Sequence, residues 1–148
     1  MTKTRILVLC TGNSARSQMG EGLFRAEGGA GVEVFSAGTK PSSIRPEAMA
    51  VMREIGIDIS GQRSKSVDEF ADQSMDYVVT VCDNARDACP LFPAGTERIH
   101  WSLEDPAAAE GSEQERLDAF RRIRDQLREC VRDFLADRAA GLRAGMQP

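Results

Sequence analysis

Residues 6–24 read ILVLCTGNSARSQMGEGLF, an apolar run followed by a polar turn and then by apolar residues at helical spacing. The run Ile6–Cys10 favours a strand that is buried on both faces of a sheet, because no polar residue interrupts it. Apolar side chains recur from Ser14 to Ala26, which predicts a helix that ends at Gly28. The stretch therefore predicts a strand, a tight loop and a helix, the unit from which parallel α/β sheets are built.

The same alternation continues along the chain and predicts a single domain over residues 1–148. Three more strands are predicted, over Val32–Ala37, Met75–Cys82 and Arg98–Leu103. Three more helices are predicted, over Pro46–Ile55, near Ser66–Ala71 and after a capping box at Ser112–Glu115. Strands that alternate with helices indicate an α/β fold with a parallel sheet. The residues after about 138 are interpreted as a frayed tail.

Composition excludes several classes of function. The chain carries a net charge of −4 at pH 7, so no basic surface is evident for nucleic acid. No apolar run is long enough to span a bilayer or to form a secretory signal, so the reducing cytoplasm is the expected compartment. Four cysteines in that compartment favour redox or nucleophilic chemistry over a disulfide framework. With one histidine and no Cys-x-x-Cys pair, neither a metal site nor a cofactor is expected.

Two cysteines and one aspartate stand where predicted strands end. Cys10 and Cys82 are the last residues of the first and third predicted strands, and Asp105 follows the fourth. In an open parallel sheet, ligands bind beyond the carboxyl ends of the strands, where the strand order switches. We therefore expect these three side chains to share one rim of the sheet.

The loop after Cys10 is suited to a tetrahedral anion. Its backbone N–H groups can turn inward as a nest, and the following helix adds the positive field of its N-terminus. Gly12 can take a positive φ, and Asn13 is the next most tolerant residue type. The Arg16 guanidinium can clasp two anion oxygens. The same field favours Cys10 as a thiolate, to which Ser17 can donate a hydrogen bond. The expected anion-binding residues are Thr11, Gly12, Asn13, Ser14, Ala15 and Arg16.

This Cys-x5-Arg-Ser loop between a strand and a helix resembles the anion loop of the low-molecular-weight phosphotyrosine phosphatase superfamily. Within that superfamily the chain resembles the thioredoxin-coupled arsenate reductases, from about residue 4 to residue 136. The resemblance implies a four-stranded parallel sheet of order 2-1-3-4 flanked by helices. In that sheet the strands that end in Cys10 and Cys82 are neighbours.

The stretch CDNARDACP, residues 82–90, separates reductases from phosphatases in this superfamily. A phosphatase needs one nucleophile and water, whereas a reductase needs further thiols to carry two electrons outward. The resemblance implies that Cys10 attacks arsenate, that Cys82 then pairs with Cys10, and that Cys89 pairs with Cys82 for thioredoxin to reduce. A helix over this segment would hold the Cα atoms of the last two cysteines ~10 Å apart, beyond the ~7 Å limit for a disulfide. We therefore predict a redox-driven change of order across residues 82–90.

The pair Asp105-Pro106 stands where the superfamily carries its general acid. A carboxyl close to a thiolate and a bound dianion retains a proton, because like charges disfavour its ionised form. Tyrosine phosphatases of this type usually carry aromatic residues next, as walls for a phenyl ring, whereas this chain has Ala107, Ala108 and Ala109. This difference favours a bare oxyanion as the substrate.

Some arsenate reductases of this family bind a potassium ion beside the anion loop. Asn13, Glu21 and Ser36 match that site, but Lys65 stands in place of its further carboxylate. An ammonium group competes with a cation for the same oxygens. We therefore expect Lys65, rather than a metal, to meet Glu21.

Other conspicuous residues are interpreted as structural. Cys130 is assigned to the apolar core of the last helix, and His100 and Trp101 to packing or hydrogen bonding at the fourth strand. The basic run Arg121–Arg124 is interpreted as a solvated helix face.

Three functions are compatible with these residues. The favoured one is reduction of arsenate to arsenite for arsenic detoxification, with thioredoxin as reductant and a weak phosphatase activity beside it. The alternatives are a low-molecular-weight tyrosine phosphatase with regulatory cysteines, and a binding module that senses an anion. The expected partners are arsenate and thioredoxin, with no nucleic acid and no membrane, and the chain is expected to be a monomer.

Overall fold

The structure is a computed structural model that describes residues 3–89, 92 and 95–146, with side chains up to residue 137. Its strands are β1 (Thr4–Cys10), β2 (Val32–Gly38), β3 (Tyr77–Thr80) and β4 (Glu97–His100). Its helices are α1 (Arg16–Gly28), α2 (Pro46–Glu54), α3 (Asp83–Ala88) and α4 (Glu113–Met146), with short 3-10 turns η1 (Gly29–Gly31), η2 (Val67–Phe70) and η3 (Pro106–Ala108). The strands form one parallel sheet in the order β2-β1-β3-β4, which confirms the predicted fold.

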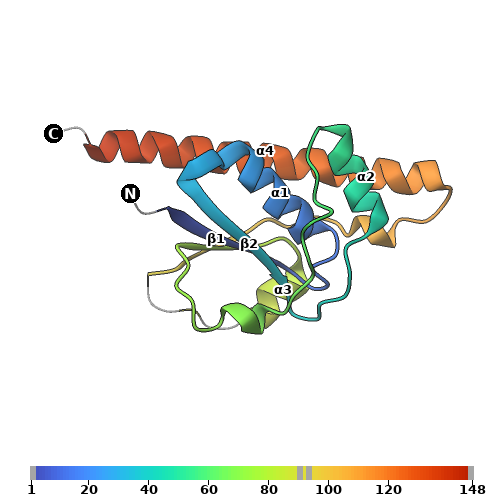
Figure 1. The fold of residues 1–148 in the computed structure, drawn as a ribbon, viewed down its shortest axis with the longest axis horizontal. Helices are drawn as coiled ribbons and strands as arrows, with labels where there is room; N and C mark the ends of the chain where they lie inside the picture. The colour runs from blue at the N-terminus through green and yellow to red at the C-terminus, as the bar shows by residue number, and fades with distance from the viewer. Residues whose placement is uncertain (1–2, 90–91, 93–94, 147–148) are drawn as a thin grey trace.

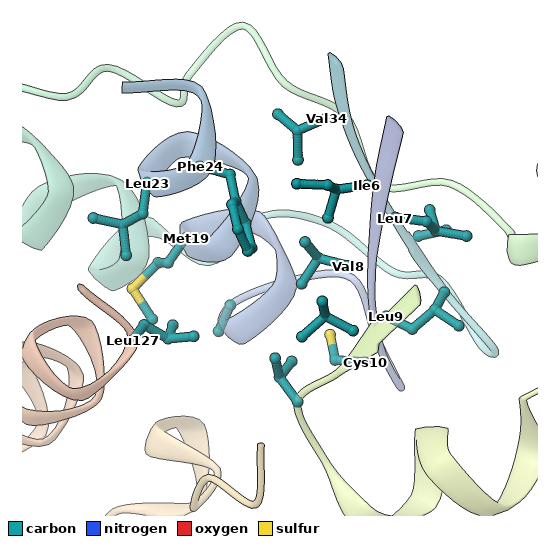
Figure 2. Packing of buried hydrophobic residues seen from close by; sticks show 14 of the residues in the cluster. Ile6, Leu7, Val8, Leu9, Cys10, Met19, Leu23, Phe24, Val34 and Leu127 are labelled. Carbon is teal, nitrogen blue, oxygen red and sulfur yellow. The ribbon is translucent and has the colours of Figure 1, made fainter. Parts of the chain in front are cut away.

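Strand β1 lies at the centre of the sheet, between β2 and β3. Its residues from Ile6 to Cys10 are all buried, because both faces of a parallel sheet are covered. Figure 2 shows the alternation of these side chains: Ile6 and Val8 point toward α1, whereas Leu7 and Leu9 point to the opposite face. Two-sided burial explains why this strand is a continuous apolar run.

Helices cover the two faces of the sheet unequally. Helices α1, α2 and α4 lie on one side, and the short helix α3 lies on the other (Figure 1). Met19, Leu23 and Phe24 of α1 fill the space between the sheet and Leu127 of α4 (Figure 2). Trp101 stacks on Phe24 with ring centroids 5.9 Å apart. The prediction of a packing role for Trp101 is therefore confirmed.

Helix α4 begins with the predicted capping box. The amide of Glu115 donates to Ser112 Oγ at 3.1 Å, and the amide of Ser112 donates to Glu115 Oε1 at 3.3 Å. Its backbone is helical to Met146, past residue 138 where a frayed tail was predicted. Extending a formed helix adds one hydrogen bond per ordered residue, so a run with three alanines and two arginines continues it past Gly141 and Gly145. Residues 147 and 148 lie outside the described part of the chain.

Strands β3 and β4 are shorter than predicted. The Val81 amide still donates to Leu9 O at 2.9 Å, but Cys82 then turns away to cap α3. The Trp101 amide donates to Thr80 O at 2.9 Å, after which the chain leaves the sheet toward Asp105. Both strands end where their next residues join the rim of the sheet.

Two assignments on α4 were wrong. Cys130 is half-buried rather than within the core, because Leu127 and Val131 carry the buried stripe on either side of it. Arg124 is buried rather than solvated, and its Nη1 donates to Val51 O at 2.9 Å and to Glu54 Oε1 at 2.8 Å. The basic run therefore joins α4 to α2.

Among the described residues, no helix has both the length and the apolar composition that crossing a membrane requires.

Candidate active site

The loop after β1 borders a pocket of about 220 Å³ at the carboxyl end of the sheet. This volume is several times the ~30 Å³ share of a water molecule in the liquid, so a tetrahedral oxyanion can enter. The pocket brings together most of the residues predicted to form the site. It is lined by Cys10, Thr11, Gly12, Ser14, Ala15, Arg16, Ser42, Arg45, Asp105 and Ala107.

Cys10 is held by a hydrogen bond from the first turn of α1. Its Sγ lies 2.8 Å from Ser17 Oγ, and both residues are buried. Asn13 Nδ2 donates to the same Ser17 Oγ at 2.8 Å. Because Ser17 Oγ already accepts from Asn13, its own proton is free to point at Cys10. This arrangement suits a thiolate, which accepts hydrogen bonds and is the nucleophilic form of cysteine.

Asn13, rather than Gly12, takes the left-handed conformation in this loop, with φ of 47°. Asparagine tolerates this region better than most residues with a Cβ. Its side chain is fully buried and bonded at both ends. Nδ2 also donates to Ser36 Oγ at 3.0 Å, and Oδ1 accepts from the Lys65 amide at 3.0 Å. Asn13 therefore lies beneath the pocket and supports the loop instead of lining it.

The segment from Lys40 to Arg45 fixes the direction of the loop amides. Amides of this segment donate to loop carbonyls: Lys40 N to Thr11 O at 2.8 Å, Ser42 N to Gly12 O at 2.9 Å and Arg45 N to Ser14 O at 2.8 Å. A peptide unit directs its N–H opposite to its C=O. Carbonyls that turn outward therefore leave the loop amides free to face an anion, as the predicted nest requires.

Arg16 and Asp105 meet across the pocket. Arg16 Nη1 donates to Leu103 O at 2.9 Å, and its Nη2 lies 3.9 Å from Asp105 Oδ2. Oδ1 of Asp105 also accepts from the Ala107 amide at 3.0 Å and so caps η3. Both contacts hold the carboxyl at the entrance of the pocket.

Of the three alanines after Asp105, only Ala107 lines this pocket. Ala108 and Ala109 line a neighbouring hollow of about 420 Å³ between η3 and α4, together with Arg122. Among the described residues, none that lines this pocket is aromatic, as expected, although two of the alanines lie elsewhere.

The structure brings Cys82 to the anion loop but leaves Cys89 apart. Cys82 is buried, and its Sγ lies 3.3 Å from Thr11 Oγ1 and accepts from the Ala85 amide at 3.3 Å. Cys89 lies at the far end of α3, half-buried, and burial raises the pKa of its thiol. All four cysteines are free thiols. Residue 90, the last of the predicted redox segment, lies outside the described residues.

Sequence reasoning missed two residues of the pocket, Ser42 and Arg45. Arg45 occupies the N-cap position of α2, where its side chain makes no capping hydrogen bond and its surface is exposed. Ser, Thr, Asp and Asn are the residues favoured at this position. An arginine directly before Pro46, which begins the helix, is unusual at an N-cap, and this could have identified Arg45 as a functional residue from the sequence.

The predicted contact between Lys65 and Glu21 is confirmed. Lys65 Nζ lies 3.7 Å from Glu21 Oε1, and Arg25 Nη2 donates to Glu21 Oε2 at 2.8 Å. Ser36 Oγ donates to Glu21 Oε1 at 2.6 Å. With two side-chain cations already facing this carboxylate, the residues do not fit a potassium ion. Burial lowers the pKa of Lys65, and the charge of Glu21 opposes this effect. Within the described ranges, no group of three or more His, Cys, Asp or Glu residues is arranged to hold a metal.

This chain is similar to known proteins over nearly all of its length. The family model for low molecular weight phosphotyrosine protein phosphatase matches residues 5–144. An arsenate reductase of Halalkalibacterium halodurans is 46% identical over 134 residues, which cover 90% of this chain and 96% of that protein.

Two solved structures are also similar to this chain in both sequence and fold. An arsenate reductase in a phosphate-binding state is 33% identical with a TM-score of 0.75, over 90% of this chain and 98% of the other. A thioredoxin-dependent arsenate reductase of Corynebacterium glutamicum is 30% identical with a TM-score of 0.67, over 91% of this chain and 63% of the other. The chain therefore belongs to the low molecular weight phosphotyrosine protein phosphatase family.

Proposed function

We propose that this protein reduces arsenate to arsenite through Cys10, Cys82 and Cys89, with thioredoxin as the reductant, and so detoxifies arsenic. The observation that carries the proposal is the second buried thiol, Cys82, in contact with the anion loop at Thr11 Oγ1. A phosphatase reaction has no use for that thiol. The names of the relatives support the same reaction, and one structural neighbour is thioredoxin-dependent.

The first step forms a bond between sulfur and arsenic. Arsenate binds the loop amides, Arg16 and Arg45, as a tetrahedral dianion. The Cys10 thiolate attacks arsenic, and one arsenic–oxygen bond breaks. Asp105 gives its proton to the departing oxygen, which leaves as water. The hydrogen bond from Ser17 keeps the thiolate oriented toward the pocket.

The second step reduces arsenic. Cys82 loses its proton and attacks the sulfur of Cys10, and the electron pair of the sulfur–arsenic bond passes to arsenic. Arsenic leaves as arsenite in the +3 state, and a Cys10–Cys82 disulfide remains. The neighbouring strands β1 and β3 support this attack, since they end in Cys10 and just before Cys82.

In the third step the disulfide passes from the Cys10–Cys82 pair to the Cys82–Cys89 pair. Cys89 attacks the sulfur of Cys82, Cys10 leaves as a thiolate, and the resulting Cys82–Cys89 disulfide is reduced by thioredoxin. Cys89 lies seven positions after Cys82, across the six residues of α3, so their Cα atoms stand ~10 Å apart. A disulfide needs them within ~7 Å. Helix α3 therefore opens in this step.

A phosphatase activity is the second candidate. Cys10, Arg16 and Asp105 line one pocket and form the full set for phosphate monoester hydrolysis, which uses neither of the other thiols. Only Ala107 follows the aspartate along the pocket wall, so we expect weak activity on aryl phosphates. The proposal also treats the protein as one domain that acts as a monomer.

The test measures arsenite release with thioredoxin, thioredoxin reductase and NADPH. Cys10→Ser, Cys82→Ser and Cys89→Ser should each lose turnover by ~10³-fold or more, the scale at which removal of a catalytic nucleophile is felt. Hydrolysis of p-nitrophenyl phosphate should be lost only in Cys10→Ser. Cys130→Ser is the matched control, because this thiol lies on α4 outside the pocket, and it should retain both activities.

Two results would contradict the relay. Full turnover in Cys89→Ser would show that the third step does not occur, and full turnover in Cys82→Ser would show that the second does not occur. Phosphatase activity without arsenite release in the unmodified protein would favour the phosphatase. Replacement of thioredoxin by glutathione and glutaredoxin identifies the reductant independently of the relay.

A further inference from the structure

The only histidine of the chain lies outside the anion pocket and bridges two elements. His100, the last residue of β4, places Nε2 2.9 Å from Asp83 Oδ1 and Nδ1 2.7 Å from Thr80 Oγ1. Its side chain is 20% exposed. The ring is therefore held between β3 and the start of α3.

The direction of these hydrogen bonds follows from the state of Asp83. Its Oδ1 also accepts from Ser102 Oγ at 3.2 Å. The hydrogen bonds from His100 and then Ser102 lower the pKa of Asp83, so its carboxylate is ionised and only accepts. Nε2 of His100 must therefore carry the proton and donate. In the neutral ring, Nδ1 accepts from the hydroxyl of Thr80. We call the bonds of His100 and Ser102 to Asp83 the Asp83 tether.

The Asp83 tether holds a helix that is too short to be stable alone. Helix α3 spans only Asp83–Ala88, well below the length at which isolated helices persist in water. Its first turn is fastened at two points: Cys82 Sγ accepts from the Ala85 amide, and Asp83 is tied to β4 and the residues after it. The same six residues separate Cys82 from Cys89.

We propose that His100 and Ser102 are positioning residues that hold α3 helical and thereby oppose the Cys82–Cys89 disulfide. The inference deepens the relay proposed above and rests on it for its role in turnover. Bond formation between Cys82 and Cys10 draws Cys82 Sγ away from the Ala85 amide. The Asp83 tether then holds the first turn of α3 together with the backbone hydrogen bond from the Arg86 amide to Cys82 O at 3.1 Å.

The resting place of Cys89 fits this role. A pocket of about 210 Å³ between α3 and β4 contains Cys89 together with His100, Arg86, Arg98 and Ile99 in its lining. Burial raises the pKa of Cys89, so the thiol stays neutral while α3 is closed. When α3 opens, Cys89 loses its proton to solvent and attacks Cys82. The bond between the sulfurs of Cys82 and Cys89 forms, the bond between Cys82 and Cys10 breaks, and the released electron pair stays on Cys10.

The test measures the redox equilibrium of Cys82 and Cys89 in the full-length chain. Cys10→Ser with Cys130→Ser leaves these two as the only thiols, and buffers of reduced and oxidised dithiothreitol set the potential. Loss of a hydrogen bond to a charged group in the dithiol form favours the disulfide. Because the Asp83 side chain is 61% exposed, His100→Ala should raise the ratio of disulfide to dithiol ~5-fold, which is about 20 mV toward more negative potential. Ser102→Ala should raise the ratio ~3-fold.

A conservative variant and a double variant distinguish a positioning role of His100 from a general effect on stability. His100→Gln can still donate to Asp83 and should stay within about twofold of the unmodified ratio. Asp83→Ala removes the acceptor of both bonds, so it should raise the ratio at least as much as His100→Ala, and adding His100→Ala to it should raise the ratio no further. Glu97→Gln is the matched control, since it is exposed at the start of β4, where its backbone amide bonds to Asp76 O. It should leave the ratio unchanged.

Opposite outcomes overturn the proposal. A lower melting temperature in His100→Ala with a ratio within twofold of the unmodified protein assigns His100 a structural role only. If the protein with His100 intact forms no Cys82–Cys89 disulfide, the relay is wrong. Amide hydrogen exchange of residues 85–88 in the reduced protein then tests the tether independently of the relay. Exchange ~5-fold faster in His100→Ala supports the tether, and equal exchange overturns it.

Discussion

At the scale of single residues, Asn13 determines how the anion loop is supported. One side chain donates to Ser17 and Ser36 and accepts from the Lys65 amide, while its backbone carbonyl accepts from Ser64 Oγ at 2.6 Å. Each of these bonds is buried or partly buried. There, a polar group without a hydrogen-bond partner destabilises the fold by more than one hydrogen bond stabilises it. The left-handed turn, the orientation of Ser17 and the position of Lys65 are therefore set together.

Arg45 gives the first prediction at this scale. Its guanidinium is exposed and lines the anion pocket, so it adds a second positive charge near Arg16. An exposed charge contributes up to ~1 kcal/mol, so Arg45→Gln should raise the KM for arsenate and the Kd for inorganic phosphate about 3- to 5-fold at low salt. Since Arg45 only binds the anion, kcat should stay within about twofold. Steady-state kinetics and phosphate titration measure both values.

The control for Arg45 lies on the same helix. Arg53→Gln removes an equal charge from the last turn of α2, outside the pocket, and should leave KM unchanged. Because salt screens exposed charges, the effect of Arg45→Gln should vanish near 1 M ionic strength. An equal rise of KM in both variants would show that Arg45 acts only through the net charge of the protein and not through contact with the anion.

At the scale of elements, the end of β2 packs against the anion loop. A Cβ on Gly38 would lie 2.5 Å from Thr11 O and 2.9 Å from Asn13 N, and both are backbone atoms that cannot rotate away. Strand β2 therefore approaches the loop more closely than any residue with a side chain permits. This contact joins the carboxyl end of the strand to the shape of the nest.

Gly38→Ala should displace the loop and weaken anion binding. We expect the Kd for inorganic phosphate to rise by ~10-fold or more, with a loss of ~1–3 kcal/mol in the free energy of unfolding from overpacking. Phosphate titration and urea unfolding measure the two effects. Gly31→Ala is the control, because nothing lies within 4 Å of a Cβ built there. Unchanged phosphate binding in Gly38→Ala would show that the loop adapts without loss.

At the scale of the whole molecule, an ion-pair cluster joins α2 to α4. Arg121 Nη2 and Arg124 Nη1 bind the two oxygens of Glu54 at 2.7 and 2.8 Å. The hydrogen bond from Arg121 is the main cause that lowers the pKa of Glu54 from 4.5 to about 2, and the bond from Arg124 adds to it. The cluster holds α2 against α4, and Arg45, the N-cap residue of α2, lines the pocket.

This cluster predicts a dependence of stability on pH. A carboxyl with a lowered pKa in the folded state stabilises the fold above its unfolded pKa, and the contribution is lost as pH falls through the folded value. Glu54→Gln should therefore be less stable than the unmodified protein at pH 6, and the two should converge as pH falls from 4.5 to about 2. Urea unfolding across this range measures the difference. Arg122→Gln, exposed on the same helix, should retain the full pH dependence.

The parts of the fold that could be predicted are those with local causes. Two-sided burial appears in the sequence as the run Ile6–Cys10, and the capping box at Ser112 uses atoms three residues apart. The anion loop was predictable for the same reason, because an inward-facing nest and a helix N-terminus need only consecutive residues. The sheet order came from the resemblance of that loop and of Cys82 and Cys89 to a known family.

By itself, the sequence determined the strand, loop and helix around Cys10, and it placed a cysteine, an arginine and a serine in that loop. Only the tertiary structure decided which distant side chains meet. Thr11 contacts Cys82, Arg45 lines the anion pocket, and His100 holds Asp83. The physical reason is range: backbone preferences and capping act over a few residues, whereas these contacts depend on how parallel strands align at one edge of the sheet.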